Sequence, residues 1–240
     1  MILDWLKKTL LNQKKQTSSN LNHQILGTNL KSPLKKNEGE IIFGCGCFWG
    51  AEKAFWKLPG VITTSVGYSG GDIINPTYNQ VCSGITGHTE VVRVTWDKRI
   101  LDISDLLKLF WECHDPTQGN RQGNDVGSQY RSAIFTMNAD DLKLSLDSRN
   151  SYQEELTKNG FNDITTEISK DKVFYYAENY HQQYLAKPGA RPYCSAMPTN
   201  IALIDFPNSN FKLDKSVWDK YDWSKSHCIL RSDNYPINVT

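Results

Sequence analysis

The sequence lacks the features that would place it in several large classes of protein. Its 240 residues contain no apolar run long enough to cross a membrane. Neither sign of charge dominates, since 27 Lys and Arg are balanced by 26 Asp and Glu for a net charge of +1. This balance gives no reason to expect nucleic acid or an anionic membrane surface as a partner. No secretory leader with an apolar stretch and a small-residue cleavage site is evident.

The chain also lacks a regular cysteine framework, although it contains six cysteines. Free thiols in a reducing compartment are therefore expected, with the cytoplasm as the predicted location and an organelle as the alternative. The pair Cys45 and Cys47 has no second Cys or His pair at zinc-finger spacing, so no metal site is predicted. No glycine-rich phosphate loop follows a predicted strand, and no cofactor is expected.

Composition divides the chain into three parts. Residues 1–38 contain seven lysines, with Asp4 and Glu38 as the only acids, and are predicted to be a polar extension or an arm on the domain. A transit peptide is the second interpretation, because such peptides favour arginine and this segment has none. Residues 39–187 have the pattern of a globular domain, and residues 188–240 are predicted to be a long, largely irregular tail.

Hydrophobic periodicity predicts strands at 41–43, 61–67, 88–97, 131–136 and 164–168, and helices at 48–58, 103–114, 138–156 and 174–185. A polar loop at 115–129 interrupts this series, and loops of that length in compact domains are usually functional or disordered. Strand hairpins are mixed with short crossovers. This mixture favours an α+β two-layer domain with a mixed or antiparallel sheet over a doubly wound parallel sheet.

Cys47 lies between a predicted buried strand and the helical pattern that starts at Phe48. At the start of a helix, free backbone N–H groups and the helix dipole favour the thiolate. The alternative is a cysteine that packs as a small hydrophobe. A nucleophilic sulfur beside Phe48 and Trp49 would suit redox or acyl chemistry on a small apolar group, although such aromatic residues are more often part of a core.

Glu90 lies on the same predicted strand face as Val92, Val94 and Trp96. A carboxyl group on an apolar face is either paired or kept neutral, because desolvation raises its pKa. A neutral carboxylic acid near pH 7 is what a general acid requires. The alternative is a glutamate at a strand end that reaches solvent or a lysine.

Three further residues follow or occupy polar loops. Tyr78 and Tyr130 either pack with satisfied hydroxyls or donate hydrogen bonds to a substrate oxygen. Asp125 either forms a turn or cap, or belongs to a site.

Two cysteines fall in the tail. Cys194 is either a spectator or a resolving thiol, which must reach a sulfenic acid and then expose a disulfide to a reductant. Cys228 either relays oxidation from Cys194 or takes no part. Cys45, Cys82 and Cys113 are interpreted as structural.

Taken in order, nine segments resemble the class A peptide methionine sulfoxide reductases. They are residues 46–50, 67–71, 75–78, 81–84, 86–90, 114–119, 121–125, 129–134 and 181–185. The resemblance covers about residues 41–185, and the collinear order makes it specific. It implies an α+β two-layer domain with a mixed or antiparallel sheet, a ferredoxin-like core and an irregular C-terminal tail.

The resemblance also implies a mechanism. The Cys47 thiolate would attack the sulfur of methionine-S-sulfoxide, free or in proteins, while protonated Glu90 protonates its oxygen. Tyr78 and Tyr130 would donate hydrogen bonds to that oxygen. The remaining roles implied are the binding of the ε-methyl group by Phe48 and Trp49, ordering of the network and its waters by Asp125, and condensation of Cys194 with the Cys47 sulfenic acid. Thioredoxin would reduce the resulting disulfide. Cys228 is a candidate for recycling, and the protein is expected to be a monomer.

The sequence departs from the family pattern in places. Cys113 stands where many members have Asn, and two prolines with few glycines surround Cys194. Two other functions remain open from the residues alone: a thiol peroxidase, which needs no Glu90, and a binding module that uses the aromatic residues as a cage for a methylated cation.

Overall fold

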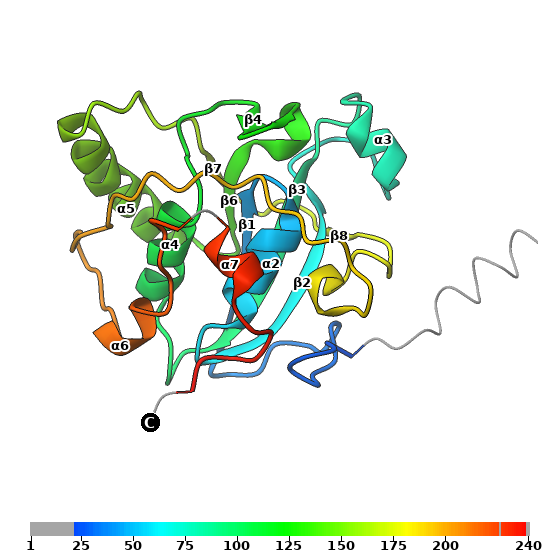
Figure 1. The fold of residues 1–240 in the computed structure, drawn as a ribbon, viewed down its shortest axis with the longest axis horizontal. Coiled ribbons are helices and arrows are strands. Elements are labelled where there is room, and N and C mark those ends of the chain that lie inside the picture. The colour runs from blue at the N-terminus through cyan, green and yellow to red at the C-terminus, as the bar shows by residue number, and fades with distance from the viewer. Residues whose placement is uncertain (1–21, 226, 239–240) are drawn as a thin grey trace, which may run out of the picture.

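The computed structural model describes residues 22–225 and 227–238 and confirms the α+β class (Figure 1). A six-stranded sheet has the order β7-β6-β1-β3-β2-β8. Its strands are β1 (Glu38–Cys45), β2 (Val61–Ser69), β3 (Thr89–Asp97), β6 (Ser132–Thr136), β7 (Glu167–Lys170) and β8 (Tyr175–Tyr176). All neighbours in the sheet are antiparallel except β6 and β7, which makes the sheet mixed.

The helices are α2 (Phe48–Trp56), α3 (Tyr78–Cys82), α4 (Ile103–Glu112), α5 (Ala139–Lys158), α6 (Lys215–Trp218) and α7 (Cys228–Arg231), with single 3₁₀ turns η1 (Ser128–Tyr130) and η2 (Tyr184–Ala186). Inside the polar loop, β4 (Arg121–Gln122) and β5 (Asp125–Val126) form a separate two-stranded ribbon. The series β1-α2-β2-β3-α4-β6, with its strands in the spatial order β6-β1-β3-β2, is the ferredoxin-like core that was expected.

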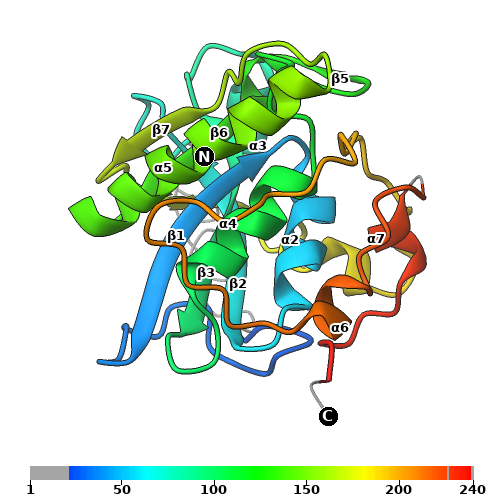
Figure 2. The same cartoon turned by 90° about the vertical axis from the view of Figure 1, so that its left-hand side faces the viewer.

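The main hydrophobic core lies between one face of the sheet and helices α2, α4 and α5 (Figure 2). Phe43 of β1 stacks on Phe55 of α2 at 4.9 Å and on Phe110 of α4 at 5.1 Å between ring centroids. Each such ring contributes about 1.5–3 kcal/mol when it is fully buried. The opposite sheet face carries a smaller cluster around Ile42 and Phe135. The sheet and α2 are thus held rigidly against each other by the side chains just behind position 47.

Local capping explains why the predicted helices begin where they do. The Asn138 side chain accepts a hydrogen bond from the backbone N–H of Asp141 at 2.9 Å, so the predicted cap of α5 is confirmed. Asp102 and Asp105 form a reciprocal capping box at the start of α4.

The helix predicted over 174–185 is wrong. Tyr175 and Tyr176 instead form β8, which pairs with Tyr68 and Gly67 of β2. A Cβ atom on Gly67 would lie 2.3 Å from the Tyr175 carbonyl oxygen, so glycine permits this close approach. Further along, Gln183 has a φ of 47°, which a continuous right-handed helix cannot contain.

The tail is irregular, as predicted, apart from the short helices α6 and α7. It is nevertheless packed onto the domain, because five of its side chains belong to the main core: Leu203, Phe206, Val217, Tyr221 and Ile229. Its last part is fixed to α2, where the Lys57 ammonium group donates to the Asp233 side chain at 2.9 Å and to the Tyr235 carbonyl at 2.9 Å. Figure 1 shows α7 beside α2.

Of the polar extension predicted over 1–38, residues 1–21 lie outside the described residues. The part that follows is in contact with the domain, since buried His23 is hydrogen-bonded to the Thr64 hydroxyl at 2.9 Å. In the described part of the chain, no helix is both long and apolar enough to cross a membrane.

Candidate active site

Cys47 occupies the N-cap position of α2, two residues after the end of β1. Gly46 makes the turn between the two elements with a φ of 84°, a conformation that disfavours other residues. The thiol therefore lies at the junction that the sequence predicted.

The expectation that the helix start lowers the pKa of this thiol is wrong for the isolated protein. Burial raises the pKa of Cys47 well above its ordinary value, and the negative charge of Glu90 raises it further. A hydrogen bond from the backbone N–H of Trp49 acts in the opposite direction but is outweighed. The missing factor is desolvation, because the same apolar walls that shape the site also penalise the thiolate.

Glu90 lies beside the start of α2 with its side chain buried. Glu90 is 2% exposed, and its carboxylate accepts a hydrogen bond from the Phe48 N–H at 3.1 Å. Burial raises the pKa of Glu90 to about 8, despite that hydrogen bond, and the charge of Asp125 adds to the increase. At pH 7, Glu90 is therefore mostly the neutral acid.

Phe48 and Trp49 form an apolar wall next to Cys47. Trp49 stacks on Tyr184 with ring centroids 3.9 Å apart, and its indole N–H donates to Nδ1 of His181 at 3.2 Å. His181 in turn packs against Phe48 at 5.1 Å. The segment that was wrongly predicted as a helix thus supplies the side chains that hold Trp49 in place.

His181 was not singled out from the sequence, although it falls in the matching segment 181–185. Burial lowers its pKa to about 4, so the ring is neutral near pH 7. Because Nδ1 accepts from Trp49, the proton is on Nε2, which is buried and has no hydrogen-bond partner within the described residues. Tyr78 lies against the same ring, with 4.5 Å between centroids.

Tyr78 and Tyr130 reach the site from different elements. Tyr78 starts α3, whose cap is Thr77, and its backbone N–H donates to Glu178 at 3.0 Å. Tyr130 ends η1. Burial raises the pKa of both hydroxyls, and the next cause for both is the charge of Glu90, so both remain protonated donors close to that carboxyl.

Asp125 lies in β5, and one of its oxygens accepts a hydrogen bond from the Tyr193 hydroxyl at 2.5 Å. Its other oxygen is buried and has no hydrogen-bond partner among the described residues. Tyr193, which the sequence did not indicate, thereby joins the tail to the polar loop at the residue next to Cys194.

The tail brings Cys194 against α2. A Cβ atom built on Gly50 would lie 2.6 Å from the Cys194 sulfur, which places this sulfur one helical turn from Cys47. Burial raises the pKa of Cys194 to about 11. Its charge also contributes to the raised pKa of Cys47. Cys194 is a free thiol, as is Cys47.

Comparison with known proteins identifies the family to which this site belongs. A family model described as peptide methionine sulfoxide reductase matches residues 39–211. The chain belongs to the peptide methionine sulfoxide reductase family. Its activity is accordingly the thiol-dependent reduction of methionine sulfoxide, and this assignment decides against the thiol peroxidase and the cation-binding module.

Relatives and solved structures of this reductase family agree. The chain is 53% identical to peptide methionine sulfoxide reductase MsrA of Vibrio vulnificus over 179 residues, which are 75% of this chain and 85% of the relative. It is 54% identical to the MsrA of Azotobacter vinelandii over 182 residues, with 75% and 83% covered. Methionine sulfoxide reductase A of Corynebacterium diphtheriae matches with a TM-score of 0.69 at 42% identity, covering 76% of this chain and 89% of that one.

Cys228, the remaining candidate of the sequence analysis, begins α7 and lines a cavity that Cys194 also lines. The structure therefore brings both tail cysteines to the same side of α2.

Proposed function

We propose that Cys47 is the nucleophile and Glu90 the general acid in the reduction of methionine-S-sulfoxide, free or in proteins. The observation that carries this proposal is the buried, largely neutral Glu90 bonded to the N–H next to Cys47. A neutral acid can protonate the sulfoxide oxygen while the sulfur of Cys47 attacks the substrate sulfur. Tyr78 and Tyr130 supply two protonated hydroxyls near the same carboxyl, and they donate hydrogen bonds to that oxygen.

The raised pKa of the Cys47 thiol fits this scheme because the net step needs no outside proton. The thiol and the sulfoxide are converted into a sulfenic acid and a thioether. Glu90 gives its proton to the sulfoxide oxygen as the new bond to Cys47 forms. The thiol proton then returns to the Glu90 carboxylate, which restores the acid.

Phe48 and Trp49 bind the ε-methyl group of the substrate in this proposal. The stacking of Trp49 on Tyr184 and its bond to His181 hold the wall still, which supports a fixed position for the methyl group. A fixed methyl group beside fixed oxygen donors allows only one configuration at the substrate sulfur. Asp125 orders the loop beside the site and any waters bound there, through its unpaired oxygen.

For recycling, we propose that the Cys194 thiol attacks the sulfur of the Cys47 sulfenic acid and releases water. The position of Cys194 against Gly50 supports this step. Thioredoxin, a cytoplasmic dithiol of low reduction potential, then reduces the disulfide. In this scheme Cys228, which lines the same cavity as Cys194, takes over the disulfide bond before thioredoxin reduces it. The protein works in this scheme as a monomer in the cytoplasm.

One assay tests the proposed function. The S- and R-epimers of a methionine sulfoxide substrate are supplied separately, with thioredoxin or dithiothreitol as reductant. Turnover of the S-epimer alone is expected, and equal turnover of both epimers would overturn the proposed geometry.

Two variants separate the roles of the cysteines. Cys47→Ser is expected to lose all turnover. Cys194→Ser is expected to produce one methionine per enzyme but to lose cycling with thioredoxin. Full thioredoxin-dependent cycling in Cys194→Ser would contradict its role as the resolving cysteine.

A further inference from the structure

Four cysteines line one cavity of about 30 Å³ beside α2: Cys45, Cys113, Cys194 and Cys228. The proposed function uses only the two that belong to the tail. The other two are the innermost, since Cys45 is 3% exposed at the end of β1 and Cys113 is 5% exposed after α4. The cavity is larger than the roughly 10–15 Å³ that one water needs, so the sulfur atoms have room to shift.

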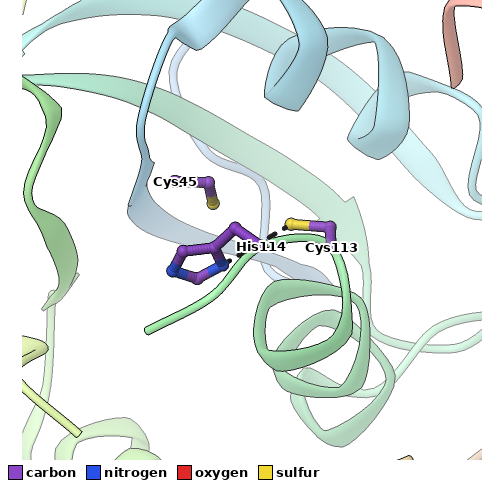
Figure 3. Close-up of side chains that lie close together, drawn as sticks. All are labelled: Cys45, Cys113 and His114. Carbon is purple, nitrogen blue, oxygen red and sulfur yellow. Dashed lines mark hydrogen bonds between the residues drawn. The ribbon is translucent and has the colours of Figure 1, made fainter. Parts of the chain in front are cut away.

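The sulfur atoms of Cys45 and Cys113 are turned toward each other (Figure 3). Together with the nearest ring nitrogen of His114, they lie within 4.8 Å of one another. Each of the two thiols also shifts the pKa of the other, which supports their proximity. Sulfur atoms that face each other within 4.8 Å can close to a disulfide of about 2.05 Å by side-chain rotation.

His114 favours thiol chemistry over metal binding at this cluster. Its Nδ1 lies 2.8 Å from the Phe110 carbonyl oxygen, which can only accept, so Nδ1 carries a proton. Its Nε2 then accepts from the Ser132 hydroxyl at 2.8 Å. Both nitrogens are therefore engaged, and no lone pair of the ring is free for a metal ion.

The same proton of His114 points near the Cys113 sulfur, at a distance of 3.8 Å between Nδ1 and Sγ. The adjacent Cys45 thiol lowers the pKa of Cys113, and His114 lowers it further, whereas burial raises the pKa of Cys45. Cys113 is thus the nucleophile of the pair and Cys45 its resolving partner.

We propose that Cys45 and Cys113 form a second redox-active dithiol, which takes over the oxidation of the active site so that the enzyme completes a second turnover without an external reductant. This inference rests on the proposed function, because it begins from the disulfide between Cys47 and Cys194. It concerns two cysteines that sequence analysis interpreted as structural.

The exchange balances in two steps. The Cys113 thiolate attacks the Cys194 sulfur, the bond between Cys47 and Cys194 breaks, and Cys47 leaves as a thiolate. Cys45 then attacks the Cys113 sulfur, Cys194 leaves as a thiolate, and the Cys45 proton passes to it. The pair Cys45 and Cys113 loses two electrons, and the pair Cys47 and Cys194 gains them.

The position of Cys194 makes this exchange feasible within the folded protein. Its sulfur lies against Gly50, on the wall of the cavity that Cys45 and Cys113 also line. Charge on Cys113 raises the pKa of Cys194, and charge on Cys194 raises that of Cys45, so the three sulfurs lie within electrostatic range of one another. Cys82 is exposed and does not line this cavity.

The experiment counts methionine in the absence of reductant. Because Cys228 could take over the disulfide by itself, the parent is Cys228→Ser, which keeps five of the six cysteines. The fully reduced parent, freed of reductant and oxygen, is mixed with excess methionine-S-sulfoxide. About two methionines per enzyme are expected, with Cys82 as the one thiol left under denaturing conditions.

Matched variants in the same background isolate the second dithiol. Adding Cys113→Ala should halve the yield to about one methionine, whereas adding Cys82→Ala should leave it at about two. Adding Cys45→Ala should leave the yield at about two but trap a Cys113–Cys194 disulfide, because Cys47 is released in the first step of the exchange. If Cys113→Ala fails to fold, Cys113→Ser gives the same reading. Peptide mapping of the oxidised parent should in addition find a Cys45–Cys113 disulfide.

The outcomes separate the two proposals. A parent that yields about one methionine, without a Cys45–Cys113 disulfide, would overturn the second dithiol and leave the proposed function intact. A parent that yields no methionine at all would overturn the proposed function itself.

Discussion

Gly50→Ala tests whether Cys194 reaches Cys47 across the first turns of α2. An added Cβ atom would lie 2.6 Å from the Cys194 sulfur and 3.3 Å from its Cβ, whereas ordinary contacts begin at 3.4 Å. The sulfur must therefore retreat by about 0.8 Å. Misplacement of a reacting atom by about 1 Å can cost 10²-fold in rate, so disulfide formation should slow by about 10- to 100-fold.

The fold should tolerate this change. Alanine is favoured over glycine inside a helix by about 1 kcal/mol, which offsets part of the roughly 1–3 kcal/mol that overpacking costs. Production of the first methionine should stay at the wild-type rate, because the new methyl group faces Cys194 and lies away from the Glu90 carboxyl.

Rapid-quench measurement of the sulfenic acid and of the disulfide separates these two steps. In Gly50→Ala the sulfenic acid should accumulate before the disulfide forms. The double variant with Cys194→Ser serves as the control, since Gly50→Ala should then have no further effect on the sulfenic acid. Disulfide formation at the wild-type rate in the single variant would refute the approach across Gly50.

Three other changes have predictable results. Glu90→Gln should lower the rate of methionine formation by about 10²–10⁴. The wild-type rate should fall as the pH rises through about 8, where Glu90 loses its proton. A pH profile of single turnover without this decline would remove Glu90 from the mechanism. Lys57→Met should cost about 2 kcal/mol in urea unfolding, because the ammonium group bonded to Asp233 is lost, and an unchanged midpoint would show that this contact adds nothing. His181→Phe should raise KM by up to about tenfold with kcat nearly constant, because Trp49 loses its acceptor; a drop in kcat alone would instead place His181 in the chemical step.

Much of the fold follows from patterns that are local in sequence. The alternation of apolar and polar residues in 88–97 predicts a strand, and the cap at Asn138 predicts the start of a helix. Both β3 and α5 form as expected. The segment 174–185 could not be predicted in this way. Its tyrosines pair with β2 and its turn at Gln183 bonds to buried Glu52 at 2.8 Å, and both contacts come from residues more than a hundred positions away.

The site shows the same division. Cys47 at a helix start and Glu90 on an apolar strand face are local features, and both could be singled out from sequence. The bond between Tyr193 and Asp125, like the role of His181 in holding Trp49, depends on tertiary packing and had no local signal beyond a motif match. The direction of the Cys47 pKa shift was also missed, since it depends on how completely the surrounding chain excludes water.

The tail is held to the domain by different numbers of hydrogen bonds at its two ends. This difference bears on how a large reductant reaches Cys194. Near Cys194 the tail is attached by the Tyr193 hydroxyl, which donates to Asp125, and by the Met197 N–H, which donates to Gln122. At the far end the ammonium group of Lys57 alone donates to three oxygens of the tail. Local detachment of the tail should therefore start beside Cys194 and stop well before the terminus. A docking protein could displace the few residues around Cys194 while the rest of the tail stays packed on the domain.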